Sequence, residues 1–303
     1  MKKKFRNLFI ELYTIYYKIL KLLNIDCVVT YYYNPPFRKK NFGDKLNMLI
    51  MRFFNKTIIN YSYLKNYNGK VLFLIGSTLN SIKEIPLTND VLVFGSGNHF
   101  NEPKQNHKRV NVKYLYIRGL LSKDNLNLSN EVNSKIRLGD LGLILSRIFP
   151  QKNINKVYDY CIFPHFSQYE TIERYNFFIT KTGGILVSPL WSPIKIIKLL
   201  NQSKHVFSSS LHGIIVSDSF NIPNTWTNFE ISSNKEIIKQ IDNFKFYDYY
   251  STFNISPKPY LFDLENVYDS LSIKSKHSNY YFEQINNVKS NLYSDFKNFI
   301  KNI

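Results

Sequence analysis

The sequence predicts an α/β protein with two Rossmann-like domains, each a doubly wound parallel sheet. Two observations predict this class. Short apolar runs, several of them ending in Gly-Ser or glycine, lead into segments with helical periodicity, which is the order of βα units. These runs do not alternate with polar residues, as expected for strands covered on both faces. The order occurs on both sides of residue 150, so we expect two such domains facing across a cleft.

The first half of the chain supplies one set of βα units. A β-branched and aromatic run predicts a strand at 27–34, and a loop at 35–47 then closes on a helix. Three further apolar runs predict strands, in "KVLFLIGST", "DVLVFGSGN" and "VKYLYIRG".

The second half repeats the pattern. Strands are expected in "YDYCIFPHF", "GGILVSPLW", "KHVFSSS" and "IPNTWTNF", with helices at 192–202 and 211–221 between them. Beyond residue 275 apolar residues recur at helical spacing and predict a terminal helix. We therefore expect an N-terminal helix at 1–25, domains at 26–150 and 151–271, and a C-terminal helix at 272–303 that packs back on the first domain.

Charge and cysteine content limit the function classes. The 303 residues carry a formal charge of +18, which attracts anions such as phosphorylated substrates or anionic lipid. Lysine and arginine are spread along the chain without a zinc-finger or RNA-binding signature, so we expect no nucleic-acid partner. Cys27 and Cys161 lie far apart and form no metal motif or disulfide framework, which suits a reducing cytosol.

The N-terminal segment allows two interpretations. Apolar residues from Phe5 to Leu22 recur at helical spacing among lysines, but Glu11, Lys18 and Lys21 interrupt any apolar run long enough to cross a bilayer. The helix either docks on its own domain or lies on an anionic membrane surface, and amphipathicity does not separate the two.

Ligands of doubly wound sheets bind at the carboxyl ends of the strands, so residues there are candidates for a site. His212 falls in the first turn of a predicted helix, facing free N–H groups and the positive end of the dipole. An anion there would favour its protonated form, which suits a general acid; the alternative is a histidine packed in the core. Arg118, at the end of a strand, is a bidentate anion ligand or a surface ion pair. Asp44 is a helix cap or a base facing the cleft.

The motifs "NFGDKLN", "LFLIGSTLN", "VFGSGNHF", "YIRGLLS", "LGDLGLIL", "FPHF", "SSSLHGIIVSDSFNIP" and "FYDYYSTF", in this order, resemble the polysaccharide pyruvyl transferase family, most closely its exopolysaccharide branch. The resemblance covers about residues 28–255. One departure concerns Ser210, because many members carry an arginine immediately before the Leu-His-Gly.

The resemblance implies a glycosyltransferase-B-like arrangement and transfer of the pyruvyl group of phosphoenolpyruvate onto two sugar hydroxyls, which forms a ketal and releases phosphate. It implies His212 as acid, Asp44 as base and Arg118 as a cation for the donor. Further expected donor-binding residues are His165, Ser209, Ser210 and Gly213. Expected cleft-lining residues are Asn41, Gly76, Ser77, Gly95 and Ser96.

The expected partners follow from the same reaction. The acceptor is a glycan or a lipid-linked oligosaccharide, and no cofactor or metal is expected. We place the protein in the cytoplasm, with contact to the inner membrane surface left open. One alternative is a glycosyltransferase that uses a nucleotide sugar on the same fold. A non-catalytic, anion-binding or membrane-associated scaffold is the other.

Overall fold

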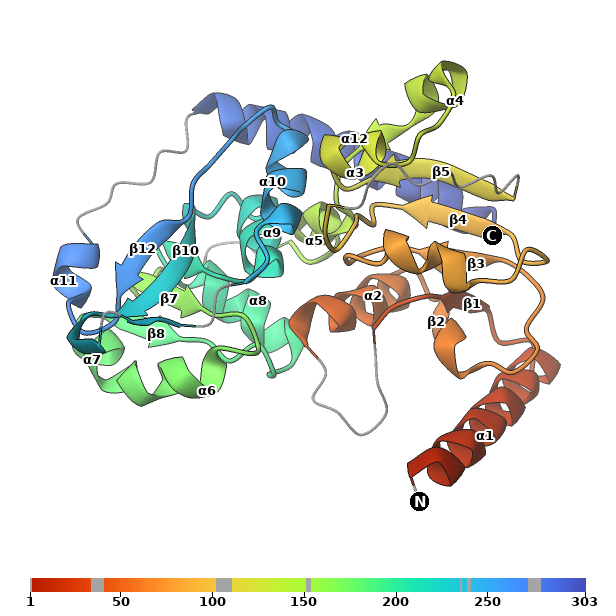
Figure 1. The fold of residues 1–303 in the computed structure, drawn as a ribbon, viewed down its shortest axis with the longest axis horizontal. Helices are drawn as coiled ribbons and strands as arrows, with labels where there is room; N and C mark the ends of the chain where they lie inside the picture. Colours follow the sequence, from red (N-terminus) through yellow and green to blue (C-terminus); the bar gives the residue numbers. More distant parts are fainter. Residues whose placement is uncertain are drawn as a thin grey trace. The chain divides into compact units, whose positions relative to one another are not determined.

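A computed structural model describes residues 2–33, 41–101, 111–150, 154–234, 236–238, 241–271 and 279–303. The chain forms two compact units, each coloured by position along the chain in Figure 1. The first unit combines Met1–Leu141 with Ser294–Ile303, and the second is Gly142–Tyr293. The division therefore falls after Leu141, whereas the sequence predicts it at residue 150.

The first unit is built on a parallel sheet. Its described strands are β1 (Cys27–Thr30), β2 (Thr57–Asn60), β3 (Val71–Phe73), β4 (Val91–Phe94), β5 (Val112–Ile117) and β6 (Arg137–Leu138). Their order across the sheet is β2-β1-β3-β4-β5-β6, with every neighbouring pair parallel. The chain moves outward from β1 to β2 and then returns past β1 to β3. The order thus reverses between β1 and β3, which is the switch point where such sheets bind ligands.

Helices cover both faces of this sheet. They are α1 (Lys2–Leu22), α2 (Phe42–Phe53), α3 (Leu120–Asp124) and α4 (Asn130–Lys135), with 3₁₀ turns at Tyr61–Tyr63 and Leu79–Glu84. In β4 the alternation of side chains separates the two faces. Val91 and Val93 join a buried cluster with Leu79 and Ile82, whereas Phe94 stacks on Tyr116 and packs against Phe296 from the end of the chain.

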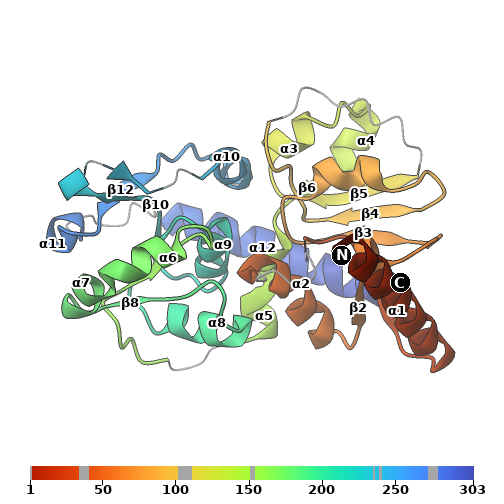
Figure 2. The same cartoon turned by 60° about the horizontal axis from the view of Figure 1, so that its bottom comes forward.

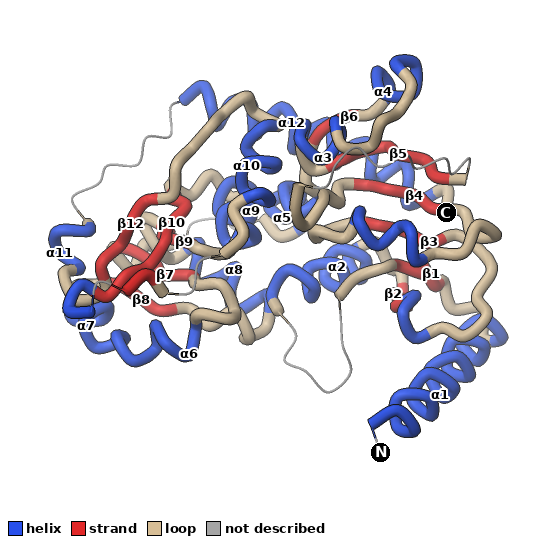
Figure 3. Tube along the Cα trace, in the orientation of Figure 1, coloured by secondary structure: helices blue, strands red, loops and turns tan. Residues whose placement is uncertain are grey.

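The second unit has a mixed sheet that is mainly parallel. Its strands are β7 (Tyr160–Phe163), β8 (Gly184–Leu186), β9 (Val206–Ser208), β10 (Asn224–Ile231), β11 (Glu236–Ile237) and β12 (Tyr260–Asp263). The order is β11-β10-β9-β7-β8, with β12 also paired to β10 and with β11 antiparallel. Here the order reverses between β7 and β9. Figure 3 shows the strands of each unit as a separate group among helices.

The helices of the second unit are α5 (Leu145–Ile148), α6 (Tyr169–Ile172), α7 (Asn176–Lys181), α8 (Pro193–Asn201), α9 (Leu211–Ser219), α10 (Phe244–Ser251), α11 (Val267–Ser270) and α12 (Asn279–Lys301), with 3₁₀ turns at Leu141–Ile144, Glu173–Tyr175 and Ser232–Asn234. Local sequence explains α8, because the Ser192 side chain accepts from the Lys195 N–H and Pro193 opens the helix. Helix α9 is buried on nearly all sides, as its composition requires.

The predicted class is confirmed: two α/β units with doubly wound sheets are present. Helix α12 has residues in both, because Asn279–Tyr293 belong to the second unit and the turns from Ser294 onward to the first. No helix in the described part of the chain is long and apolar enough to cross a membrane.

Candidate active site

At the switch point of the first unit, the side chain of Asn47 in α2 reaches the end of β3. Its side-chain amide accepts from the Ile75 N–H at 3.0 Å and donates to the Ile75 carbonyl at 3.2 Å, just beyond the end of β3. The buried amide therefore ties the helix that follows β1 to the end of β3. Sequence reasoning missed Asn47, because only the fold brings it against a residue 28 positions later.

Asp44 lies in the first turn of the same helix. The helix is capped by Asn41, whose side chain accepts from the Gly43 N–H at 2.6 Å, so Asp44 is not the cap that the sequence allowed. The Asp44 side chain is partly buried, and burial raises its pKa from 3.8 to about 7. A carboxyl group with this pKa exchanges a proton near neutral pH, as a general base does.

Hydrogen bonds join the segments that follow β3 and β4, next to the residue that Asn47 binds. The Ser96 hydroxyl donates to the Gly76 carbonyl at 2.9 Å and pairs with the Thr78 hydroxyl at 2.8 Å. Gly76 and Gly95 have φ of +120° and +101°, a conformation that favours glycine. Gly76, Gly95 and Ser96 thus shape this edge through the backbone and an internal network.

Arg118 is fully buried rather than part of a surface ion pair. Its guanidinium donates to the Ser77 hydroxyl and to the Asn98 carbonyl, both at 2.6 Å, and lies against Gly97, where a Cβ atom would come within 2.5 Å of it. Because Ser77 accepts from Arg118, its own proton can be donated elsewhere. Ser77 is partly exposed, so Arg118 can act on a ligand through this hydroxyl.

In the second unit, two serines at the end of β9 cross the switch point to β7. The Ser208 hydroxyl donates to the Phe163 carbonyl at 2.7 Å. The Ser209 hydroxyl accepts from the His165 N–H at 2.9 Å and donates to the side chain of Gln168. Gln168 in turn donates to the Ile238 carbonyl at 3.0 Å. Both serines are buried, so they hold the loop that carries His165.

Gln168 was not predicted from sequence. Its side chain joins residues 41 and 70 positions away, and nothing in the local pattern indicates those partners. The His165 ring pairs with the Ser167 hydroxyl at 2.9 Å and lies beside Phe166. The loop after β7 thus presents a partly exposed imidazole whose backbone is fixed to β9.

His212 is in the first turn of α9, as predicted, and is partly buried. Ser210 occupies the N-cap position, but its side chain makes no capping hydrogen bond and therefore leaves a hydroxyl for a ligand. The first turn has no acidic residue. The positive end of the helix dipole, the hydroxyl and the imidazole together suit an anion.

Gly213 faces inward, away from any ligand. A Cβ atom there would lie 2.3 Å from the Ser208 hydroxyl and 2.5 Å from the Phe163 ring. Glycine therefore lets α9 approach β7 and β9 closely enough to place His212 at the strand ends. Donor binding by Gly213 stays a prediction, whereas its packing role follows from the geometry.

Asp218 fixes the other end of α9. Its buried carboxylate accepts from the hydroxyls of Tyr249 at 2.7 Å and Tyr281 at 2.8 Å and from the Asn224 amide at 2.7 Å. These donors come from α10, α12 and β10. The helix that carries His212 is thus held at both ends by contacts inside the second unit.

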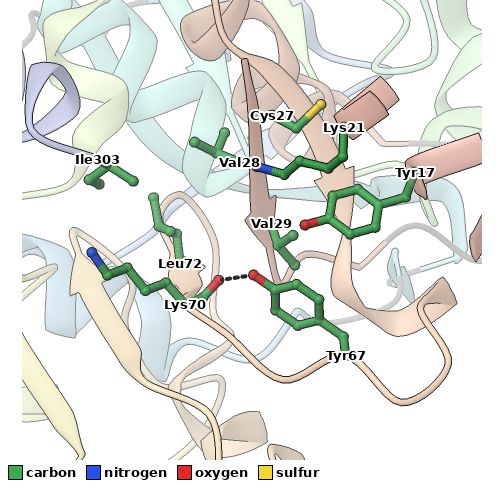
Figure 4. Close-up of a pocket in the computed structure, with 9 residues that line it drawn as sticks. All are labelled: Tyr17, Lys21, Cys27, Val28, Val29, Tyr67, Lys70, Leu72 and Ile303. Atoms are coloured by element: carbon green, nitrogen blue, oxygen red, sulfur yellow. Dashed lines mark hydrogen bonds between the residues drawn. The ribbon is translucent and has the colours of Figure 1, made fainter. Parts of the chain in front are cut away.

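A pocket of about 160 Å³ lies elsewhere in the first unit (Figure 4). It is lined by Tyr17 and Lys21 of α1, by Cys27 at the start of β1, and by Tyr67 and Lys70, among others. Cys27 and Lys70 lie at the amino ends of β1 and β3, whereas Asp44 and Asn47 belong to the helix that follows the carboxyl end of β1. None of the predicted site residues lines it, so we place the candidate site at the carboxyl ends.

The structure therefore gathers the predicted residues into two groups. In the first unit, the strand-end edge holds Asn41, Asp44, Gly76, Ser77, Gly95, Ser96 and Arg118. In the second, it holds His165, Ser209, Ser210, His212 and Gly213. Within the described residues, no group of three or more His, Cys, Asp or Glu side chains could hold a metal ion.

Comparison with known proteins identifies the family of the chain that carries these two groups of residues. The model of a family described as polysaccharide pyruvyl transferase matches residues 14–228, more than half of the chain. This chain belongs to the polysaccharide pyruvyl transferase family. The matched region includes Asp44, Arg118, His165 and His212.

Two curated proteins are similar to parts of this chain. A Rhizobium meliloti protein named succinoglycan biosynthesis protein ExoV is 23% identical over 72% of this chain and 63% of its own length. An uncharacterized protein, L143, of Acanthamoeba polyphaga mimivirus is 33% identical over 42% of this chain and 43% of its own length. The chain thus spans less than two thirds of each relative. No solved structure matches it.

Proposed function

We propose that this protein transfers the pyruvyl group of phosphoenolpyruvate to a sugar of a surface polysaccharide or of its lipid-linked precursor, forming a pyruvate ketal. The family match over residues 14–228 carries the proposal. The side chains at the two switch points support it, because burial raises the pKa of Asp44 to about 7 and His212 carries an imidazole in the first turn of α9.

The reaction makes specific demands on the protein. The methylene carbon of the donor gains a proton, which makes the adjacent carbon electrophilic. Two sugar hydroxyls each form a bond to that carbon, and its bond to the phosphate oxygen breaks. Of the two hydroxyl protons lost, one is balanced by the new methyl group and the other by the released phosphate. A proton donor, a proton acceptor and an anion site suffice, and the proposal assigns no cofactor.

His212 is the proposed acid. The start of α9 attracts the phosphate or carboxylate of the donor through its N–H groups and the Ser210 hydroxyl. A bound anion stabilises the imidazolium form, so the donor itself would favour the protonated His212 that the first step needs. His165, whose backbone N–H is held by Ser209, is a further candidate for donor binding in this unit.

Asp44 is the proposed base. Its side chain is kept from full ionisation by burial, so near pH 7 it holds a substantial unprotonated fraction that can accept a hydroxyl proton. Arg118 is proposed as a positioning residue that orients the Ser77 hydroxyl toward a ligand. Asn41, Gly76, Gly95 and Ser96 would shape the acceptor side.

The test uses the purified chain with phosphoenolpyruvate and a panel of bacterial oligosaccharides, free and lipid-linked. We expect phosphate release that requires an acceptor, together with a glycan whose mass increases by one ketal group. Thermal stabilisation is expected with phosphoenolpyruvate. Transfer from a nucleotide sugar, without any ketal product from phosphoenolpyruvate, would replace the proposal with the glycosyltransferase alternative.

The proposal places the reaction in the cytoplasm. Cys27 and Cys161 are both free, which is typical of a reducing compartment. Cys161 is fully buried and Cys27 is partly buried, so both behave mainly as small apolar residues.

A further inference from the structure

We propose that helix α1 binds the surface of an anionic lipid bilayer through an apolar stripe that its own domain leaves uncovered. The stripe consists of Phe5, Leu8, Leu12, Ile15, Ile19 and Leu22. These six side chains are between 47% and 82% exposed, although large apolar side chains are usually covered. They recur every three or four residues, so they share one face of the helix.

The opposite face docks α1 on the first unit. Phe9 and Tyr13 pack edge-on against Tyr63, with ring centroids 5.1 and 5.5 Å apart. Tyr17 packs in the same way against Tyr67 at 5.9 Å, and Leu20 is buried beside Val29 and Ile59. The helix therefore has two apolar faces, and domain docking explains only one of them.

Hydrogen bonds prevent the helix from turning its stripe inward. The Tyr13 hydroxyl accepts from the Asn60 N–H at 3.0 Å, and the Thr14 hydroxyl accepts from the Lys65 N–H at 3.1 Å. Both partners are backbone groups of the first unit, so they define the rotation of α1 about its axis. Figures 1 and 2 show α1 along the outside of that unit, with one flank away from its other elements.

The charge of the helix identifies the partner. The sequence of α1 has six basic residues, namely Lys2, Lys3, Lys4, Arg6, Lys18 and Lys21, against the single acidic residue Glu11. An apolar face on a strongly basic helix is the composition of helices that lie in the interface of anionic membranes.

The same spacing also fits the seam of a two-helix coiled coil, which would make a second copy the occupant. Charge argues against this occupant. Two α1 helices would bring twelve basic residues together, and each chain already carries a formal charge of +18. Like charges on paired helices are destabilising, whereas an anionic surface neutralises them.

The pocket in Figure 4 is not part of this surface. Its lining includes Tyr17 and Lys21, which lie on the side of α1 that faces the domain. The proposed contact is therefore with the bilayer as a surface and needs no headgroup pocket. It is also independent of the proposed reaction, because binding is measured without donor or acceptor.

The experiment is co-sedimentation of the full-length protein with vesicles of phosphatidylcholine alone or of equimolar phosphatidylcholine and phosphatidylglycerol. We expect binding to the anionic vesicles that weakens as salt is added. The double variant Leu12→Glu/Ile19→Glu should lower the partition coefficient at least about tenfold, because it places charges within the stripe.

A matched control is Leu87→Glu/Val157→Glu, which adds the same two charges at side chains that are 74% and 61% exposed elsewhere. Because its added charges lie outside the stripe, the partition coefficient of this control should be within about twofold of that of the unchanged protein. Circular dichroism and thermal melts should show that both variants are folded, because all four positions are exposed.

Three results would overturn the proposal. One is failure of the unchanged protein to bind anionic vesicles, and another is equal binding by the stripe variant. The third is a concentration-dependent dimer in light scattering that Leu12→Glu/Ile19→Glu abolishes, because this would assign the stripe to a second copy.

Discussion

The two switch points use their polar side chains differently. In the first unit the cation Arg118 is buried within the scaffold, and the carboxyl group of Asp44 remains for a ligand. In the second unit the neutral hydroxyls of Ser208 and Ser209 form the scaffold, and the basic His212 lies at the start of a helix. The side chain proposed to act at the first edge is thus a carboxyl group, the proposed base, and the one proposed at the second edge is an imidazole, the proposed acid.

The comparison also shows how each edge is stiffened. One amide, Asn47, ties helix α2 to the end of β3 in the first unit, whereas the second unit uses a chain of hydrogen bonds from the His165 N–H through Ser209 to Gln168. The bridging side chains of Asn47, Ser209 and Gln168 are buried, whereas those of Asp44 and His212 are only partly so. Among these five residues, burial distinguishes the bridging side chains from the proposed proton-transfer groups more clearly than residue type does.

The largest expected effect comes from removing the proposed acid. His212→Ala should slow acceptor-dependent phosphate release by roughly 10²–10⁴-fold, the usual contribution of a general acid. His205→Ala is the matched control. His205 immediately precedes β9, at the end of that strand away from α9, and its ring pairs with the Thr225 hydroxyl. Near-native turnover of His212→Ala would remove the acid role from the second unit.

Asp44→Asn tests the base of the first unit. We expect donor binding to be retained and transfer to be slowed roughly a hundredfold or more. The unchanged enzyme should become faster as pH rises toward about 7, where Asp44 loses its proton, and the variant should lack this rise. Asp90→Asn, at the amino end of β4, is the control. A loss of donor affinity without a catalytic defect would contradict the assignment.

The same variant should change how stability depends on pH. Burial raises the pKa of Asp44 from 3.8 to about 7, so the folded protein loses stability as pH rises between these values and the carboxyl ionises. Asn does not ionise. The free energy of unfolding of Asp44→Asn minus that of the unchanged protein should therefore be larger above pH 7 than at pH 4, by roughly 2–4 kcal/mol. Urea titrations at both pH values measure this, and an unchanged difference would refute the burial effect.

Gly213→Ala tests the packing of α9 in the second unit. A Cβ atom would overlap the Ser208 hydroxyl and the Phe163 ring, so we expect a loss of about 1–3 kcal/mol in the free energy of unfolding. Denaturant titration measures the loss. If stability and activity are both unchanged, the close approach of α9 to the strands does not position His212.

The smallest effects should distinguish two adjacent serines. Ser209→Ala breaks the bridge to His165 and Gln168, so it should lower stability by about 1–2 kcal/mol. Ser210→Ala removes a side chain with no capping bond, so it should leave stability unchanged and raise the KM for phosphoenolpyruvate several-fold. The reverse pattern would exchange their scaffold and ligand roles.

Much of the fold was predictable because its signals are local. The apolar runs around β3, β4, β5 and β7 and the serine-rich entry to α9 each lie within one segment. The strands β2, β6, β11 and β12 were not predicted; β6 and β11 have only two residues each and carry little pattern of their own.

The site was predictable only in part, for a related reason. Sequence located Asp44, Arg118 and His212 at strand ends, but not their environments. That Asn41 caps α2 in place of Asp44 depends on where the helix begins, and the burial of Arg118 depends on how Gly97 packs. Asn47 and Gln168 act through partners 28 to 70 residues away, which only tertiary structure supplies.

The membership of α12 in both units bears on the order in which the protein matures. Phe296 packs on Phe94, and the Tyr116 hydroxyl donates to Asp295 at 2.6 Å, so the core of the first unit uses residues that are translated after the second unit. Domains generally fold as units during synthesis, N-terminal first. Here the N-terminal unit must wait, with Phe94 uncovered, until translation of the second unit is complete.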